Sequence, residues 1–407
     1  MGECLSLSEA HNFAILDDKL YSTVQSKQDE LKRELDATNK IKKCFYCGKE
    51  VTSFCNSHHI PDFVLRIISN NGYLYNYTAA LDKASDYDKI KIGHNQAGTF
   101  KLICVDCDKK VFAKYEQPEV YQKKFSNEAF TLIALKNYLK FLHKRIYEKK
   151  DYQSKIDSMN KYKDYFLSDL SIDFFEKELP KIAQYLCYED LFINTNEDIV
   201  NYKNKILEIK NNTSNYQIFY YKKLDYIVPL AAQTMIALFS DFNDVVINNC
   251  YDINFIPKEL HIAVFPFKTC SYIIMGADIT SGLYDNFYRQ FRMLSENDKS
   301  SVINYLIIRY SEDYFYTESL QNIIKCNEKV KKYIELTSCY VNEISNEKII
   351  RAFLYCKEED ISFNLSEFIR NTTQKYKVEN LKYIIKSHSL NNRFDIPNFL
   401  DKKYAIG

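Results

Sequence analysis

Two pairs of cysteines constrain this chain more than any other feature of its sequence. Cys44 and Cys47 are separated by two residues, and so are Cys104 and Cys107. A C-x2-C turn presents two thiolates to one tetrahedral zinc ion, so two such pairs can form a closed structural site. The alternative is four unrelated buried cysteines, which requires both spacings to arise by chance. Cys55 lies between the pairs and is a minor alternative ligand.

Composition excludes several other classes of site. Only 8 of the 407 residues are glycine, and no spacing among them gives a G-x-G-x-x-G or Walker A loop. A dinucleotide or P-loop nucleotide site is therefore excluded. The 55 basic and 54 acidic residues nearly cancel, so any nucleic-acid contact must come from a local patch. Because the N-terminus lacks a signal pattern and no apolar run reaches about 18 residues, we expect a cytoplasmic protein with no membrane contact.

The sequence pattern indicates an α+β fold class with several parts. Charged, helix-prone sequence precedes the cysteines, and a helical periodicity runs over 125–149. The polar run 211–215 marks a boundary, after which the pattern changes to short β-rich runs and then returns to helix. We expect an N-terminal helix at 1–43, a zinc-bound module at 44–118, a helical connector at 119–210 and a larger α+β domain at 211–407.

The C-terminal half is expected to contain a sheet. Aromatic and β-branched residues are concentrated in three runs, and a turn at Lys268-Thr269 can join two of them into a hairpin. The longest apolar stretch, Tyr226–Phe239, carries polar residues and fits a buried core segment. Beyond Tyr284 the pattern is mostly helical to about Ser389. The predicted strands are Tyr216–Tyr221, Leu260–Phe267 and Ser271–Ala277.

A short motif between the two cysteine pairs carries the functional signal. It reads Ser57-His58-His59-Ile60-Pro61. With a C-x2-C pair on either side, the segment at about 40–118 resembles zinc-bridged HNH endonucleases of the ββα-metal class, and its spacing is most similar to the recombination endonuclease VII variant. The resemblance implies that His58 binds a catalytic metal ion and that His59 is the general base that activates water.

The resemblance also implies a further metal ligand directly after the second cysteine pair. Asp108 holds that position, where the family more often has asparagine or histidine. An aspartate is a competent ligand for Mg²⁺ or Mn²⁺, so the difference affects metal preference more than binding. A second departure is the long stretch at 62–100, which the family core does not need. If Asp108 is not a ligand, Glu116, His94 and Asn95 are the next candidates.

The chemistry supports these roles independently of the family. Hydrolysis of a phosphodiester needs a base to activate water and a cation beside the leaving oxygen. His59 and one divalent ion, Mg²⁺, Mn²⁺ or Ni²⁺, would meet both needs. A structural zinc ion on the four cysteines would hold Asp108 at a fixed distance from the two histidines. The expected activity is therefore metal-dependent cleavage of nucleic acid, with double-stranded DNA as the first candidate.

A basic helix follows the cysteine module. Lys136, Lys140 and Lys144 recur at every fourth position, with aromatic residues interleaved. This pattern suits contacts to a nucleic-acid backbone, and an ordinary solvated helix face is an equal alternative.

Three functions stay open from the sequence. The first is a DNA endonuclease whose C-terminal half recognises a substrate, a signal, a regulatory partner or a second copy of the chain, as in restriction or phage-defence effectors. The second is a non-catalytic, zinc-dependent module that binds nucleic acid or protein. In the third, the C-terminal half is the enzyme and the zinc module is a docking device.

Overall fold

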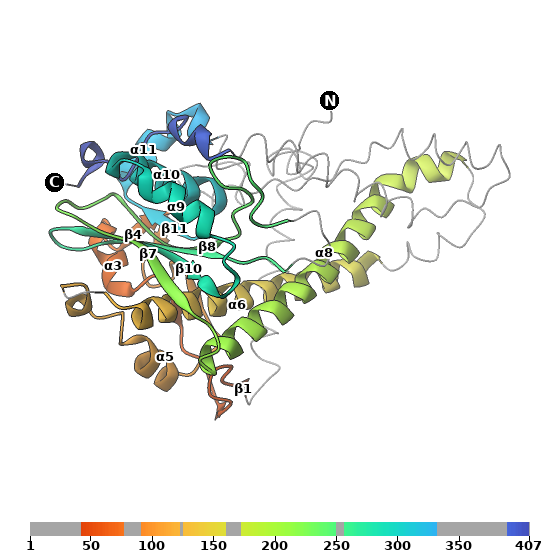
Figure 1. The fold of residues 1–407 in the computed structure, drawn as a ribbon. Helices are drawn as coiled ribbons and strands as arrows, with labels where there is room; N and C mark the ends of the chain where they lie inside the picture. Colours follow the sequence, from red (N-terminus) through yellow and green to blue (C-terminus); the bar gives the residue numbers. More distant parts are fainter. Residues whose placement is uncertain are drawn as a thin grey trace. The chain divides into compact units, whose positions relative to one another are not determined.

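The structure is a computed structural model in which two compact units are distinguished (Figure 1). The first unit comprises Met1–Leu5, Phe141–Lys205 and Tyr340–His388, and the second comprises Ser6–Lys140, Ile206–Cys339 and Ser389–Gly407. The structure describes residues 42–76, 91–122, 125–159, 172–249, 256–331 and 389–406. The helix expected at 1–43 lies outside these residues except for Lys42–Lys43, which form a strand.

A seven-stranded antiparallel sheet is the centre of the second unit. Its strand order is β5-β4-β11-β8-β9-β10-β7, and every pairing is antiparallel. All three strands predicted in the C-terminal half are confirmed, including the β9-β10 hairpin. The strands are β4 (Tyr73–Tyr75), β5 (Lys91–Gly93), β7 (Tyr216–Leu224), β8 (Leu230–Ile236), β9 (Leu260–Pro266), β10 (Ser271–Asp278) and β11 (Tyr314–Tyr316).

The sheet is covered by helices on both faces (Figure 1). Every residue of β8 and β9 is buried, which fits the near-continuous apolar sequence of a strand covered on both sides. The core segment predicted at Tyr226–Phe239 is therefore confirmed. One face carries α9, α10 and α11, and the other carries α3 and the first part of α6. The helices are α3 (Asp62–Ile68), α5 (Val105–Phe112), α6 (Asn127–Met159), α8 (Ile172–Lys210), α9 (Asp285–Met293), α10 (Glu296–Tyr310) and α11 (Glu318–Lys325), with 3-10 turns at Pro118–Gln122, Ile279–Ser281, Leu390–Phe394 and Lys402–Tyr404.

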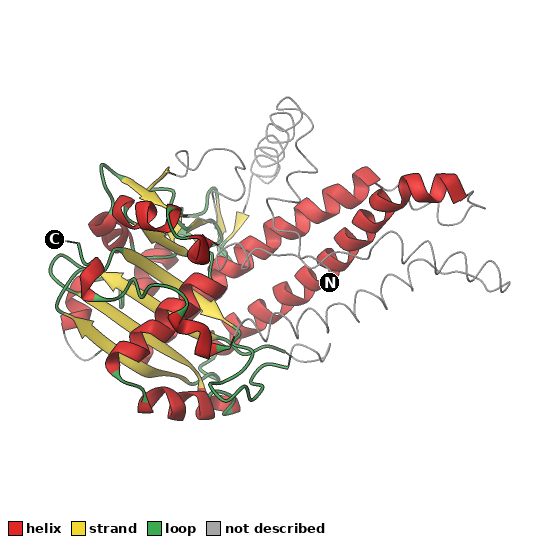
Figure 2. Ribbon diagram, turned by 90° about the horizontal axis from the view of Figure 1, so that it is seen from above, coloured by secondary structure: helices red, strands yellow, loops and turns green. Residues whose placement is uncertain are grey.

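In the first unit, the parts of α6 and α8 at 141–159 and 172–205 lie side by side (Figure 2). An ion pair of 2.7 Å between Arg145 Nε and Asp198 Oδ2 joins them. Predicted helix at 125–149 is confirmed as α6, and the change from helix to strand near 211–215 falls between α8 and β7. Among the helices in the described ranges, none is long and apolar enough to cross a membrane.

The fold class predicted from the sequence, α+β, is confirmed. One difference concerns the segment expected as a separate module at 44–118. Its strands β4 and β5 extend the large sheet, because Tyr75 pairs with Tyr316 of β11 and their rings stack. The side chain of Asn76 also donates a hydrogen bond of 2.9 Å to the Tyr314 carbonyl. The edge of β11 is thereby covered, which removes a row of unpaired backbone groups.

A smaller ββα arrangement remains within that segment. The strand pair β1 (Lys42–Lys43) and β2 (Glu50–Val51) precedes β3 (Ser57–His58). Strand β3 pairs antiparallel with β6 (Thr99–Phe100), and α5 follows β6 directly. Two strands far apart in the sequence and one helix thus bring the cysteines and the histidines into one region.

Candidate functional site

The four cysteines of the two C-x2-C pairs, called the cysteine cluster below, come together. Their sulfur atoms all lie within 4.8 Å of one another. The Sγ atoms of Cys44 and Cys107 are 3.8 Å apart, and those of Cys47 and Cys104 are 3.9 Å apart. Four sulfurs at about 2.3 Å from a central ion form a tetrahedron with edges of about 3.8 Å. The cysteine cluster therefore has the geometry to hold one zinc ion.

Local backbone structure explains why these sulfurs converge. Gly48 follows the first pair with φ of 74°, a conformation that favours glycine, and its N–H closes a turn on the Cys44 carbonyl. Cys104 caps the N-terminus of α5, and its sulfur accepts a hydrogen bond from the Cys107 amide. The Cys104 amide in turn donates to Cys44 Sγ at 3.2 Å. Amide donors of this kind stabilise thiolates.

Electrostatics distinguish Cys44 from the spare thiol Cys55. Burial raises the pKa of Cys44, but hydrogen bonds from backbone amides and from Cys47 outweigh it and bring the pKa down to about 7. Burial and the nearby Asp108 carboxylate raise the pKa of Cys55 to about 11. The Cys55 thiol donates to Asp108 Oδ2 at 3.4 Å instead of joining the cysteine cluster. Cys55 is thus a hydrogen-bond donor in the structure, not a fifth sulfur of the cluster.

His58 and Ser57 occupy opposite faces of β3, as neighbouring residues of a strand do. Ser57 Oγ donates a short hydrogen bond to Asp108 on α5. The His58 ring lies near two other groups: Nε2 is 3.0 Å from the His94 carbonyl and 4.0 Å from Asp62 Oδ1. No hydrogen bond or ion pair among the described residues joins His58 to Asp108, the two metal ligands expected from the sequence.

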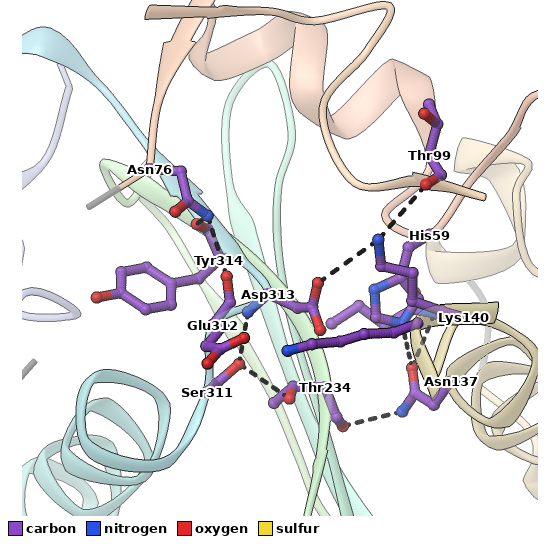
Figure 3. Close-up of polar contacts among 12 residues, drawn as sticks. His59, Asn76, Thr99, Asn137, Lys140, Thr234, Ser311, Glu312, Asp313 and Tyr314 are labelled. Carbon is purple, nitrogen blue, oxygen red and sulfur yellow. Dashed lines mark hydrogen bonds and ion pairs between the residues drawn. The ribbon is translucent and has the colours of Figure 1, made fainter. Parts of the chain in front are cut away.

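His59 is completely buried. Its Nε2 lies 2.7 Å from Asn137 Oδ1 on α6 (Figure 3). The Asn137 amide nitrogen donates to the Thr234 carbonyl at 2.9 Å, so the amide oxygen is the atom that faces His59. Because an amide oxygen only accepts, we infer that Nε2 of His59 carries the proton and that Nδ1 carries the lone pair. Among the described residues, Nδ1 has no hydrogen-bond partner.

Two charged side chains lie near this ring. Lys140 Nζ is 3.4 Å from the Thr99 carbonyl and 4.0 Å from Asp313 Oδ1 (Figure 3). Burial lowers the pKa of His59 to about 4, with Lys140 adding to this effect and Asp313 opposing it. His59 is therefore a neutral imidazole at pH 7, with a fixed tautomer and a lone pair available on Nδ1.

Asp108 belongs to a buried ionic group. Lys136 is 1 % exposed; its Nζ donates to Glu116 and lies 3.5 Å from Asp108 Oδ1. The ammonium also lies 4.4 Å from the centre of the Phe112 ring. The spacing of four residues between the lysines indicates a basic helix face in contact with solvent. In the structure Lys136 is instead buried, because two carboxylates of the preceding segment pair with it. Lys136 is therefore unavailable to nucleic acid in this conformation.

The other two lysines are more accessible. The Lys140 side chain is 16 % exposed, and the Lys144 side chain, which lies 4.0 Å from Glu148, is 34 % exposed. Their predicted contact with nucleic acid stays a prediction.

Asn137 contacts the candidate site but was missed by sequence reasoning. It lies on the buried side of α6, near Tyr138 and the fully buried Ile133 and Ala134. A polar residue on an apolar helix face was the available signal, but its partners His59 and Thr234 are 78 and 97 positions away. Asp62, which directly follows the motif, was likewise not singled out.

Comparison of the chain with protein-family models, with curated proteins and with solved structures finds no match.

Proposed function

We propose that this chain is a metal-dependent endonuclease that hydrolyses phosphodiester bonds, with DNA as its first candidate substrate. The observation that carries the proposal is the order β3, β6, α5, in which two antiparallel strands are followed by a helix whose start carries two members of the cysteine cluster. His58 and His59 lie at the end of the first strand of this arrangement. The resemblance of about 40–118 to HNH endonucleases supports the same chemistry.

In this proposal His59 is the general base. The lone pair on its Nδ1 can accept a proton from the attacking water, while Asn137 retains the proton on Nε2. A divalent ion held in part by His58 would stabilise the charge on the leaving oxygen, and a zinc ion on the cysteine cluster would be structural. Because His59 is completely buried, a substrate reaches its Nδ1 only if the packing around the ring opens.

A specific observation favours a second candidate function. His59 is sealed from solvent and Asp108 pairs with a buried lysine, an arrangement suited to a non-catalytic, zinc-dependent binding module. The C-terminal half of the chain would then supply the binding surface. In the nuclease proposal, the same half recognises a substrate, a signal or a partner, by analogy with restriction and phage-defence effectors.

Plasmid cleavage separates the two functions. The full, zinc-loaded chain is incubated with supercoiled DNA and Mg²⁺, Mn²⁺ or Ni²⁺. We expect cleavage by the wild type and a rate at least about 100-fold lower for His59→Ala, with zinc content and DNA binding retained. His143→Ala, which removes a histidine of α6 outside the ββα arrangement, is the matched control and should cleave normally.

Two results would contradict the nuclease proposal or its base. Absence of cleavage by the wild type with all three ions supports the binding module. Normal cleavage by His59→Ala excludes His59 as the base.

A further inference from the structure

We propose that His58, Asp62 and His94 form a binding site for one divalent transition-metal ion, distinct from the cysteine cluster. The three residues come from different elements of the second unit: the end of β3, the first residue of α3 and the turn after β5. Two imidazoles and one carboxylate form the ligand set that Mn²⁺, Fe²⁺ and related ions take with open coordination positions.

Both imidazoles lie near one oxygen of the same carboxylate. Asp62 Oδ1 is 4.0 Å from His58 Nε2 and 4.0 Å from His94 Nε2. Ligand atoms around an ion with bonds of about 2.1 Å lie roughly 3 Å apart in an octahedral arrangement. Coordination of one ion therefore requires each imidazole to approach the carboxylate oxygen by about 1 Å and the two rings to approach each other. The side chains are 19 %, 33 % and 21 % exposed, so an ion can enter from solvent.

The hydrogen bonds around His94 leave a lone pair directed at the carboxylate. Its Nδ1 lies 3.3 Å from the Gly72 carbonyl. Since a carbonyl only accepts, Nδ1 carries the proton of the neutral ring and Nε2 carries the lone pair. In metal-binding histidines, the ring nitrogen that does not bind the ion usually donates its proton to a carbonyl or carboxylate. His94 is thus oriented as a ligand before any ion binds.

The carboxylate of Asp62 is oriented in the same way. Arg66 Nε holds Oδ2 at 2.7 Å, which directs Oδ1 toward the two rings. Oδ1 is buried and has no hydrogen-bond partner among the described residues. Two acceptors, Asp62 Oδ1 and His94 Nε2, therefore face each other without a donor between them, and a cation would satisfy both. His58 Nε2 faces the His94 carbonyl and carries its proton, so His58 completes the site when this proton moves to Nδ1 and Nε2 turns to the ion.

This site deepens the proposed function, because it replaces Asp108 with Asp62 and His94 as partners of His58. The catalytic role of the ion rests on the proposed function, whereas binding of the ion does not. The binding test is done at pH 7.5.

In the experiment, the full, zinc-loaded chain is titrated with MnCl2 alone. Binding is measured by calorimetry and by the EPR signal of free Mn²⁺. We expect one Mn²⁺ per chain. His94→Gln and Asp62→Asn should each raise the Kd at least tenfold, and His143→Gln should leave it unchanged. Each variant is used only if its zinc content and melting temperature match those of the wild type. Because two ligand positions are tested separately, a folding defect in one variant does not decide the result.

Several outcomes would overturn the site: no saturable Mn²⁺ binding, an unchanged Kd in both ligand variants, or a tenfold loss in Asp108→Asn with none in His94→Gln. The site and the nuclease function can fail separately. Mn²⁺ binding with the expected dependence but no DNA cleavage keeps the site and removes the function. DNA cleavage without Mn²⁺ binding at these residues keeps the function and removes the site.

Discussion

At the scale of single residues, His59 links protonation to folding. Its folded-state pKa is about 4 because burial disfavours the charged ring, against an ordinary value of 6.5. Between these values the unfolded chain binds a proton at this position that the folded chain excludes. The contribution of the neutral His59 ring to the free energy of unfolding is therefore complete above pH 6.5. It is lost as the pH falls from 6.5 to about 4. This difference between the two pKa values corresponds to about 3 kcal/mol in the free energy of unfolding.

We predict that His59→Gln removes this part of the pH dependence. The wild type should lose about 1 kcal/mol more free energy of unfolding than the variant between pH 7.5 and pH 5.5. Urea unfolding of both proteins at the two pH values measures the difference. Acid release of zinc affects both chains alike, so it cancels in the comparison. Identical pH dependence in the two proteins would show that His59 titrates normally.

At the scale of elements, Lys136 connects α6 to α5 and to the segment after it. Its ammonium pairs with Glu116 and Asp108 and lies over the Phe112 ring. Burial raises the pKa of Glu116, while Lys136 opposes this. A buried ion pair contributes little compared with an apolar replacement, but removal of one partner leaves an uncompensated charge. The position of α5 against α6 thus depends on all three charged groups together.

Removal of the cation alone should be the most harmful change in this group. We predict that Lys136→Met lowers the free energy of unfolding by about 3–5 kcal/mol, because two carboxylates then face each other in a buried site. The triple variant Lys136→Met, Glu116→Gln and Asp108→Asn should recover part of the loss. Denaturant titration measures both. A single variant as stable as the wild type would mean that the pairs are exposed in solution.

At the scale of the whole molecule, the cysteine cluster and the large apolar core are separate sources of stability. The core is formed by β8, β9 and β10 with α9 and α10, and none of its members is a ligand of the cluster. The cysteines instead connect the turn at 44–47 to the start of α5, 57 positions away between Cys47 and Cys104. Loss of zinc should therefore act on the ββα arrangement first.

We predict one zinc ion per chain in the purified protein. Cys44→Ser and Cys107→Ser should lose it, since structural zinc contributes directly to folding. Hydrogen exchange should then increase at 42–58 and 99–112 while β8–β10 stay protected. Cys326→Ser, at an exposed cysteine outside the cluster, is the control and should keep its zinc. Elemental analysis that finds no zinc in the wild type would contradict the assignment.

Much of the fold was readable because its signals are local. The C-x2-C spacing predicts the cysteine cluster, since a two-residue gap forces both thiols to one side of a turn. The β9-β10 hairpin follows from two apolar β-rich runs joined by a short turn, and β8 from a buried apolar stretch. Each C-x2-C pair and each strand signal is local, whereas the meeting of the two pairs spans the 57 positions between Cys47 and Cys104.

The environment of each candidate side chain could not be read in this way, because it depends on residues far away in the chain. The sequence by itself brings His58 and His59 next to each other, but α6 buries His59 against Asn137, and α3 and the β5 turn surround His58 with Asp62 and His94. Likewise, the spacing of Lys136 indicates a helix face, whereas only Glu116 and Asp108 explain why that face is inside. Local spacing determines which residues share a turn or a strand; long-range packing determines which of them meet solvent, a proton or a metal ion.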